Sequence, residues 1–330
     1  MKLKFCHSFF SNSMTPPVSN ASAVTRSHLT ALTWNWQGFP ICYHTQGDRG
    51  PAVVLVHGFG ASWGHWRKNI PALATTCRVY ALDLIGFGGS AKPKPGSLQP
   101  GEQIEYTMET WGQQVADFCQ EVVGGPAFLV GNSIGCIVAM QAAVERPEIA
   151  LGVALLNCSL RLLHDRKRLG LPWHRRVGAP VLQRLLAVSW IGQFFFSRLA
   201  QRKVVRKILL QAYRDPAAVS DELVDLLMAP TVDAGAAAVF LAFTRYSQGP
   251  LPEDLLPVLP CPAIILWGAE DPWEPIALGQ EFAKFPQVEQ FIPLAGLGHC
   301  PQDEAPERVN PILQEWILAK AATHSEESVP

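Results

Sequence analysis

The chain has 330 residues, of which 48% are hydrophobic and 17% are charged. This composition can bury a large core, and it excludes a mostly disordered, collagenous or coiled-coil protein. The formal net charge is -1 at pH 7, which excludes a globally basic nucleic-acid-binding protein and an acidic solvating chain.

The eight cysteines are scattered along the chain, and none belongs to a C-x-x-C pair. Zinc sites and redox dithiols need closely spaced ligands, so the sequence predicts neither, and it predicts no other metal or cofactor. Several cysteines lie in or next to apolar runs such as 150–158, which favours buried, reduced thiols in a reducing compartment.

The first 47 residues contain no acid, and residues 8–30 are rich in Ser, Thr and Asn. This composition is typical of an organelle transit peptide, but a disordered extension or a true start at Met14 fits equally well. The segment lacks the apolar run of a secretory signal. We therefore place residues 1–29 outside the fold and predict a cytoplasmic protein, or one of the plastid stroma if this segment is a transit peptide.

From Thr30 onward, strand-like and helix-like patterns alternate. Two short strands are expected over 30–46, and continuous apolar runs typical of buried parallel strands follow at 52–56, 79–82, 127–130, 153–156, 263–267 and 288–293. Helical patterns lie between them at 66–75, 107–123, 134–146, 275–284 and 305–320. This alternation predicts an α/β fold with a doubly wound, mostly parallel sheet.

The alternation is interrupted once, where about a hundred residues from Cys158 to Pro260 have only helical patterns. We interpret this segment as a helical lid inserted between two strands. The expected organisation is therefore a first core part at 30–157, a lid at 158–260, a second core part at 261–322 and a flexible tail at 323–330. The longest uncharged apolar stretch, 127–144, approaches the length of a membrane span, but its central polar and glycine residues favour a buried strand, turn and helix.

The segment Gly131-Asn132-Ser133-Ile134-Gly135 directly follows the predicted strand 127–130 and opens the predicted helix 134–146. A sharp strand-to-helix turn forces its middle residue into a strained backbone conformation, and small flanking residues let the turn close. Ser133 Oγ is then presented at the carboxyl end of the sheet, where open α/β folds bind ligands. We therefore predict that Ser133 is a nucleophile.

A serine nucleophile needs a base, and the base needs an orienting carboxylate. His299, just after the last predicted strand, is the candidate base. Glu270 and Asp271 follow the preceding strand, and Asn157 ends the strand before the lid, at another position where an acid could stand. The chain order Ser133, Asp271, His299 is the one expected for such a nucleophile turn, and a motif match described below favours Asp271 over Glu270.

The turn Val56-His57-Gly58-Phe59-Gly60 ends the first buried strand. Its backbone N–H groups lie near the same sheet edge, so we predict an oxyanion hole formed by the N–H groups of Phe59 and Ile134. His57 is expected to support this turn rather than to transfer protons. The glycine-rich loop 83–90 lacks the lysine of a phosphate-binding loop, so we expect it to close tightly beside the site.

Together these motifs resemble those of the α/β-hydrolase superfamily over about residues 45–322. The motifs are H-G-x-G at His57, D-x-x-G-x-G-x-S from Asp83 to Ser90, G-x-S-x-G around Ser133, G-x-x-D from Gly268 to Asp271, and G-H-x-x-x-x-E-x-P from Gly298 to Pro306. The resemblance implies that Ser133 is the nucleophile, Asp271 the orienting acid and His299 the base.

A narrower resemblance rests on Gly131-Asn132-Ser133, the run 153–157 and Glu270-Asp271-Pro272-Trp273. These segments are similar to the pheophytinase and chlorophyll-dephytylase-like hydrolases of phototrophs, which cleave the phytyl ester of chlorophyll pigments. Cys136 stands where those proteins usually have a second glycine. The resemblance implies a serine-dependent carboxylic ester hydrolase that forms an acyl-enzyme and acts on a lipophilic ester.

Other functions of the same fold stay open. Dehalogenases and epoxide hydrolases use an aspartate nucleophile, and Ser133 argues against both. Carbon–carbon bond hydrolases and perhydrolases keep the same triad, and a ligand-binding receptor can retain it with little turnover.

Charge is distributed unevenly along the chain. Thirteen Lys or Arg and one acid, Asp165, lie between Cys158 and Arg214, so this part carries +12 and the remainder -13. Trp173, Trp190 and the run 194–196 are interleaved with the basic residues. The segment is either an ordinary solvated helical face with aromatics in the lid core, or a surface that docks on an anionic membrane. A small lipophilic ester is the expected partner, and nucleic acid is not.

Overall fold

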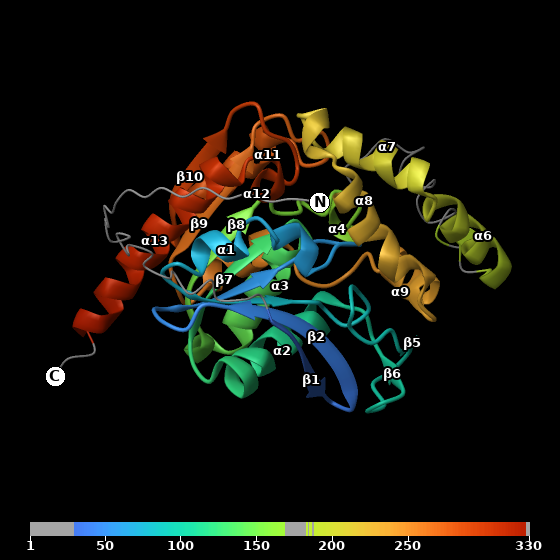
Figure 1. The fold of residues 1–330 in the computed structure, drawn as a ribbon, viewed down its shortest axis with the longest axis horizontal. Helices are drawn as coiled ribbons and strands as arrows, with labels where there is room; N and C mark the ends of the chain where they lie inside the picture. Colours follow the sequence, from blue (N-terminus) through green and yellow to red (C-terminus); the bar gives the residue numbers. More distant parts are fainter. Residues whose placement is uncertain (1–29, 169–182, 184, 187, 328–330) are drawn as a thin grey trace, which may run out of the picture.

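An eight-stranded sheet forms the centre of the computed structural model (Figure 1), which describes residues 30–168, 183, 185–186 and 188–327. The strands are ordered β1-β2-β4-β3-β7-β8-β9-β10. Their bounds are β1 Thr30–Trp36, β2 Phe39–Gln46, β3 Ala52–Val56, β4 Arg78–Leu82, β7 Ala127–Asn132, β8 Ala150–Leu156, β9 Ala263–Gly268 and β10 Val288–Leu294. β2 pairs antiparallel with β1 and β4, and every other neighbour pair is parallel. The predicted doubly wound, mostly parallel sheet is confirmed.

Both faces of the sheet are covered by helices, which explains the continuous apolar runs. Val54 and Val56 of β3 join the core cluster under α2 and α3, whereas Val53 and Leu55 join the cluster under α1 and α13. Successive side chains of a strand point to opposite faces, so a strand covered on both sides must be apolar throughout. The covering helices are α1 Ile70–Leu73, α2 Met108–Phe118, α3 Ile134–Glu145, α11 Ile276–Gly279, α12 Pro301–Glu304 and α13 Pro306–Glu327.

Several shorter elements complete the fold. The two-residue strands β5 Lys94–Pro95 and β6 Gln103–Ile104 pair with each other. A π-helical turn, Cys119–Val123, ends α2, and 3-10 helices span Trp63–Trp66, Pro147–Ile149, Pro216–Ala218, Ala229–Val232, Leu256–Val258 and Gln280–Lys284. Helix α13 continues to Glu327, so the segment expected to be a flexible tail is helical as far as that residue. Of the seven cysteines that the structure describes, none forms a disulfide and six are buried.

The described residues between β8 and β9 contain helices and no strand. We call residues 158–260 the lid segment. Its helices are α4 Asp165–Arg168, α6 Ser189–Leu199, α7 Arg202–Ala212, α8 Asp221–Met228, α9 Ala236–Arg245 and α10 Pro252–Leu255. In Figure 1, α6 and α7 extend along one side of the molecule, with α8 and α9 between them and the core. The expected leader at 1–29 and the basic pair Arg175-Arg176 lie outside the described residues.

No single helix in the part of the chain that the structure describes is long and apolar enough to cross a bilayer. One bent pair, Asp221–Val232 and Ala236–Arg245, passes by length and composition alone, with an angle of 96° between its halves. The apolar stretch 127–144 forms β7, the turn at Ser133 and the buried helix α3.

Candidate active site

Ser133 occupies the tight turn between β7 and α3. Its backbone has φ +58° and ψ -121°, a conformation that residues with a side chain rarely adopt. The turn closes because its glycines touch backbone: a Cβ on Gly131 would lie 2.4 Å from Gly135 O, and a Cβ on Gly135 would lie 2.3 Å from Val56 O. The close packing at Gly131 and Gly135 leaves no room for a side chain at either position, and this packing maintains the strained backbone of Ser133.

His299 and Asp271 form a buried pair. Asp271 follows β9 and His299 follows β10, and His299 Nδ1 lies 2.7 Å from Asp271 Oδ2. Burial alone would raise the pKa of Asp271, but hydrogen bonds from His299, Asn157 and the Trp273 N–H outweigh it and lower the pKa. An ionised Asp271 keeps the proton of His299 on Nδ1, which leaves Nε2 free to accept a proton.

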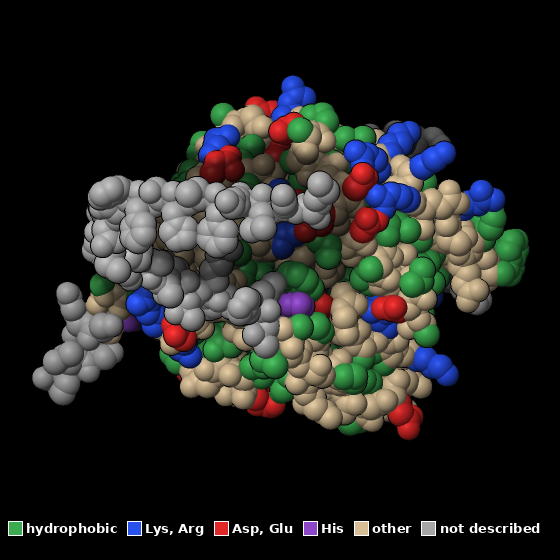
Figure 2. Space-filling model, in the orientation of Figure 1, with side chains coloured by type: hydrophobic (Ala, Val, Ile, Leu, Met, Phe, Trp, Pro, Cys, Tyr) green, Lys and Arg blue, Asp and Glu red, His purple; other side chains and the backbone are tan. Residues whose placement is uncertain are grey.

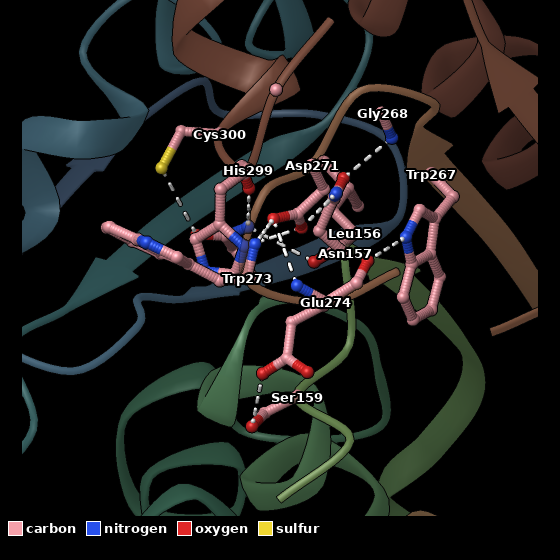
Figure 3. A network of polar contacts seen from close by, with 12 residues as sticks. Leu156, Asn157, Ser159, Trp267, Gly268, Asp271, Trp273, Glu274, His299 and Cys300 are labelled. Atoms are coloured by element: carbon pink, nitrogen blue, oxygen red, sulfur yellow. Dashed lines mark hydrogen bonds and ion pairs between the residues drawn. The ribbon is translucent and has the colours of Figure 1, made fainter. Parts of the chain in front are cut away.

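The other two candidate positions for an acid differ sharply. Asn157 donates from Nδ2 to Asp271 Oδ2 at 2.7 Å and accepts the Gly268 N–H on Oδ1 at 2.9 Å (Figure 3). Asn157 thus joins the end of β8 to the Asp271 loop. The side chain of Glu270 is exposed. Sequence reasoning noted Asn157 as a neutral residue at a strand end but did not identify its contact with Asp271.

Ser133 and His299 line one cavity of about 410 Å³. Among the described residues no hydrogen bond links Ser133 Oγ to His299. The cavity is therefore where the predicted nucleophile and the His299–Asp271 pair meet. The lid segment contributes ten of the lining residues, all of them apolar except Thr231. They are Phe196, Leu199, Ala200, Val205, Ile208, Leu209, Ala212, Leu227, Thr231 and Phe240.

Two backbone N–H groups are available beside Ser133. Ile134 is the first residue of α3, where an N–H has no acceptor within its own helix. Phe59 lies in the turn after β3, and neither amide has a hydrogen-bond partner in the described part of the chain. The turn packs closely on Ser133, since a Cβ on Gly58 would lie 3.1 Å from Ser133 Cβ. Both predicted oxyanion donors therefore belong to residues next to Ser133 or next to a residue packed on it.

His57 fixes the peptide that carries the Phe59 N–H. Its Nδ1 lies 2.7 Å from Gly58 O, and its Nε2 accepts the Leu84 N–H at 3.1 Å. Burial lowers the pKa of His57 to about 4, so the ring is neutral. Gly58 C=O and Phe59 N–H belong to one trans peptide and point in opposite directions. By holding the carbonyl, His57 directs the N–H the other way.

Asp83 closes the glycine-rich loop beside this turn. Its carboxylate accepts the Trp63 N–H at 2.7 Å and the Gly89 N–H at 2.8 Å. A Cβ on Gly88 would lie 2.1 Å from Asp83 Oδ2. The loop is therefore filled by its own aspartate rather than shaped to hold a phosphate.

Two glutamates that sequence reasoning did not assign attach the lid segment to the catalytic loops. Glu274 lines the cavity and accepts hydrogen bonds from Ser159 Oγ at 2.9 Å and Leu160 N at 3.0 Å, and burial raises its pKa. Glu304 accepts the Gly298 N–H at 2.8 Å and the Asp215 N–H at 2.6 Å. The position of Glu304 in the G-H-x-x-x-x-E-x-P motif was the available signal.

Within the described ranges, no group of three or more His, Cys, Asp or Glu side chains is placed to hold a metal ion. The polar groups at the cavity include those of Ser133 and His299, whose partner is Asp271, with the neighbouring backbone amides.

Comparison with known proteins gives one family match and several relatives. The sequence profile of the alpha/beta hydrolase family matches residues 53–312. The chain is 28% identical over 300 residues to the chloroplastic pheophytinase of Arabidopsis thaliana, covering 81% of this chain and 61% of that protein. It thus spans about three-fifths of that relative's length. Over 118 residues it is 34% identical to 2-hydroxy-6-oxo-6-(2'-aminophenyl)hexa-2,4-dienoic acid hydrolase of Metapseudomonas resinovorans, covering 34% of this chain and 38% of that protein.

A solved structure shows the same fold. The serine hydrolase CarC, involved in carbazole degradation, aligns with a TM-score of 0.69 at 20% identity, covering 88% of this chain and 99% of that chain. At this level of identity the likeness extends to the fold alone.

Proposed function

The chain belongs to the alpha/beta hydrolase family, and on that premise we propose that it hydrolyses carboxylic esters through an acyl-enzyme on Ser133. One observation carries the proposal. Ser133 stands on a strained turn and lines the same cavity as His299, whose Nδ1 lies 2.7 Å from Asp271 Oδ2. A serine hydroxyl beside a base and its orienting acid is the arrangement that nucleophilic acyl transfer requires.

The reaction proceeds in two halves. Ser133 Oγ attacks the ester carbonyl while His299 Nε2 takes its proton, and Asp271 stabilises the imidazolium that forms. The N–H groups of Phe59 and Ile134 bind the oxyanion, each contributing about 3–4 kcal/mol of transition-state stabilisation. His299 then gives its proton to the departing alcohol oxygen, which leaves an acyl-enzyme. Water attacks this ester with His299 as base again, and collapse of the second intermediate releases the acid and restores Ser133.

The cavity supports a neutral, lipophilic ester. Its lid-side wall is almost entirely apolar, and among the described lining residues there is one acid, Glu274, and no Lys or Arg. A substrate that carries a free carboxylate would lose its hydration without gaining a cationic partner there. The relative from Metapseudomonas resinovorans is named for a dienoic acid. The lining therefore favours an ester over the anionic substrates of that kind of carbon–carbon bond hydrolase.

A phytyl ester of a chlorophyll pigment is the specific candidate. The long branched hydrocarbon of a phytyl group suits an apolar wall, and the relative from Arabidopsis thaliana is named a pheophytinase. The pigment ester is therefore the first lipophilic substrate to test.

Covalent labelling and a substrate screen test this function. A fluorophosphonate probe should label the purified protein, and Ser133→Ala should remove the label. The screen compares short and long p-nitrophenyl esters with pheophytin, and the products are separated by chromatography. Faster turnover of the long-chain or phytyl esters supports the proposal. Saturable ligand binding without labelling or turnover of any ester would instead identify a receptor.

We further propose that the lid segment meets an anionic lipid surface through α6 and α7. Trp190 and Phe194 are 72% and 57% exposed, one turn apart on α6, and the Arg198 guanidinium lies 4.9 Å from the centre of the Phe194 ring. Lys203 and Lys207 are exposed on α7, and no described acid pairs with them. Figure 2 shows basic side chains over α7 and hydrophobic ones at the outer end of α6.

The charge of this surface is smaller than the sequence count suggests. Arg202 and Arg206 form ion pairs with Asp221 of α8, and Arg202 also pairs with Asp225. These pairs hold α7 on α8. The cations left for a lipid surface are Arg198, Lys203 and Lys207, beside the exposed aromatic side chains that membrane-surface helices use.

Vesicle co-sedimentation tests the contact. The protein should bind vesicles that contain anionic lipid more tightly than neutral ones, and salt should weaken the binding. The charge reversals Lys203→Glu and Lys207→Glu together should reduce binding at least about tenfold. The matched pair Arg49→Glu and Lys284→Glu, on exposed positions of the core, should not. Binding that is indifferent to anionic lipid and to the lysine changes would refute the contact.

A further inference from the structure

Aromatic rings join the predicted oxyanion turn to helix α9 of the lid segment. The Phe59 and Phe243 rings are stacked, with centroids 4.3 Å apart and an angle of 24° between their planes. Phe240, one turn earlier on α9, lies 5.4 Å from the same ring. On the core side, Phe87 meets Phe59 edge-on at 5.7 Å. The side chain of Phe59 is therefore held between the core and the lid segment.

From this stacking we propose that Phe243 is a positioning residue, which holds the Phe59 N–H where it binds the oxyanion. The proposal rests on the ester hydrolysis proposed above. It assigns to the lid segment a role in the chemical step, in addition to enclosing the substrate.

The turn around Phe59 is closed at Gly58 O, which accepts the Ala61 N–H at 3.3 Å. His57 also fixes Gly58 O, from the core side. Gly60, the residue after Phe59, has φ +69° and no heavy atom within 4 Å of the position of a Cβ. The Phe59 amide has no hydrogen-bond partner among the described residues. Between Gly58 and Ala61, the contacts of the Phe59 ring with Phe87 and Phe243 hold the turn against the core and the lid segment. An oxyanion donor must lie within about 2.7–3.1 Å of the developing charge. A small shift of the turn would therefore weaken the hydrogen bond from the Phe59 N–H to the oxyanion.

Phe243 is itself firmly placed. Its ring lies 5.6 Å from the buried ring of Trp111, which also contacts Phe87 at 5.7 Å. Phe240 lines the cavity, whereas Phe243 is not among the lining residues. Phe243 can therefore influence the reaction through Phe59 without touching the substrate.

Substitutions of Phe243 test whether it positions the Phe59 N–H or only contributes to the stability of the fold. Phe243→Leu should lower kcat for p-nitrophenyl acetate about tenfold and change KM by less than about twofold, because the lost interaction is made in the transition state. The inhibition constant of phenylboronic acid, which forms a tetrahedral anion on a serine, should rise by a similar factor. Phe243→Tyr keeps the ring and should keep kcat.

The matched control is Phe291→Leu. Phe291 is half-buried and stacks on Trp267 at an angle of 24°. The leucine variant therefore loses a comparable aromatic contact, but one that lies away from the turn. It should lower the free energy of unfolding without changing kcat. If Phe243→Leu does not fold, as judged by circular dichroism, Phe243→Met keeps the volume and removes the ring.

A double-mutant cycle tests the route of the effect. In a Phe59→Leu background, which keeps the backbone N–H, Phe243→Leu should have no further effect on kcat. Additive losses, or an active Phe243→Leu enzyme with unchanged kcat and boronate affinity, would overturn the positioning role and leave the hydrolase assignment intact. A wild type that neither turns over the ester nor binds the boronate would overturn the proposed function and this role with it.

Discussion

Asn157 and His299 meet the same carboxylate oxygen, Oδ2 of Asp271, each at 2.7 Å. The second oxygen, Oδ1, accepts the backbone N–H groups of Trp273 and Glu274 at 2.9 and 3.1 Å. The carboxylate is thus held by Asn157, directly after β8, and by the backbone of its own loop, with the histidine as one of several partners. This arrangement explains why the pKa of Asp271 is lowered although the group is buried.

Asn157→Ala should therefore weaken catalysis without weakening substrate binding. Asp271 would lose one of its hydrogen bonds and be free to turn away from His299, so we expect kcat to fall about tenfold with little change in KM. Steady-state kinetics with a short ester measure both constants. Asn35→Ala, at an exposed position near the end of β1, is the control. An Asn157→Ala enzyme with the kcat of the wild type would remove Asn157 from the catalytic arrangement.

Asn157→Asp should shift the pH dependence instead. A second carboxylate beside Asp271 adds negative charge near His299, and negative charge raises the pKa of a histidine. The acid limb of the kcat/KM profile, which reports the free enzyme's base, should move to higher pH. The profile is measured from pH 5 to 9 with a neutral ester. An unmoved acid limb contradicts the contact between Asn157 and the pair.

Asp271→Asn tests which carboxylate orients His299. An amide cannot hold the imidazole in the tautomer with the proton on Nδ1 in the way a carboxylate does, so kcat should fall by about 10⁴, compared with about 10⁶ for Ser133→Ala. Glu270→Gln is the matched control, because Glu270 is adjacent in sequence and exposed. Near-wild-type kcat in Asp271→Asn together with a large loss in Glu270→Gln would reverse the assignment.

The sheet and the turn at Ser133 could be predicted because both depend on local sequence. A strand that is covered on both faces must be apolar throughout, as in β3, and a tight turn that excludes side chains must have glycines at fixed spacing, as around Ser133. Each requirement therefore produces a sequence pattern that spans only a few neighbouring residues and can be recognised without the structure. The order of the motifs along the chain then follows from the order of the strands.

The contacts that complete the site could not be predicted in this way, because they join residues far apart in sequence. Asn157 and Asp271 are 114 positions apart, and either side chain alone is an ordinary polar residue after a strand. The basic lid segment gives a second example. From the sequence alone, Arg202 contributes to the positive charge of the lid segment. In the structure, α7 packs on α8 and Arg202 forms an ion pair with Asp221. Charge along a sequence is therefore a poor guide to charge on a surface.

Gly131→Ala should destabilise the fold strongly. The new Cβ would lie 2.4 Å from Gly135 O and 2.5 Å from Cys136 N, so the start of α3 would have to move. We expect the free energy of unfolding in urea to fall by about 3 kcal/mol or more. Gly125→Ala is the control, since no heavy atom lies within 4 Å of its Cβ position. Equal stability of the two variants would contradict the close packing of the turn.

His65 should make the stability depend on pH. It is buried beside the cavity, both ring nitrogens lack a hydrogen-bond partner among the described residues, and burial lowers its pKa from 6.5 to about 4. Between these values the unfolded chain binds a proton at this site that the folded chain does not. Stability is therefore lost as the pH falls through 6.5 toward 4, and His65 accounts for about 2 kcal/mol of the loss between pH 8 and pH 5.

His65→Leu tests this dependence, because it removes the titrating group while keeping an apolar side chain. Urea unfolding at pH 8 and pH 5 gives the loss of stability for each protein. The variant should lose about 2 kcal/mol less than the wild type over this interval. His57 is a poorer choice, although its pKa is also lowered to about 4, because its ring holds Gly58 and Leu84. An equal loss in His65→Leu and wild type would mean that His65 is not held neutral in the folded protein.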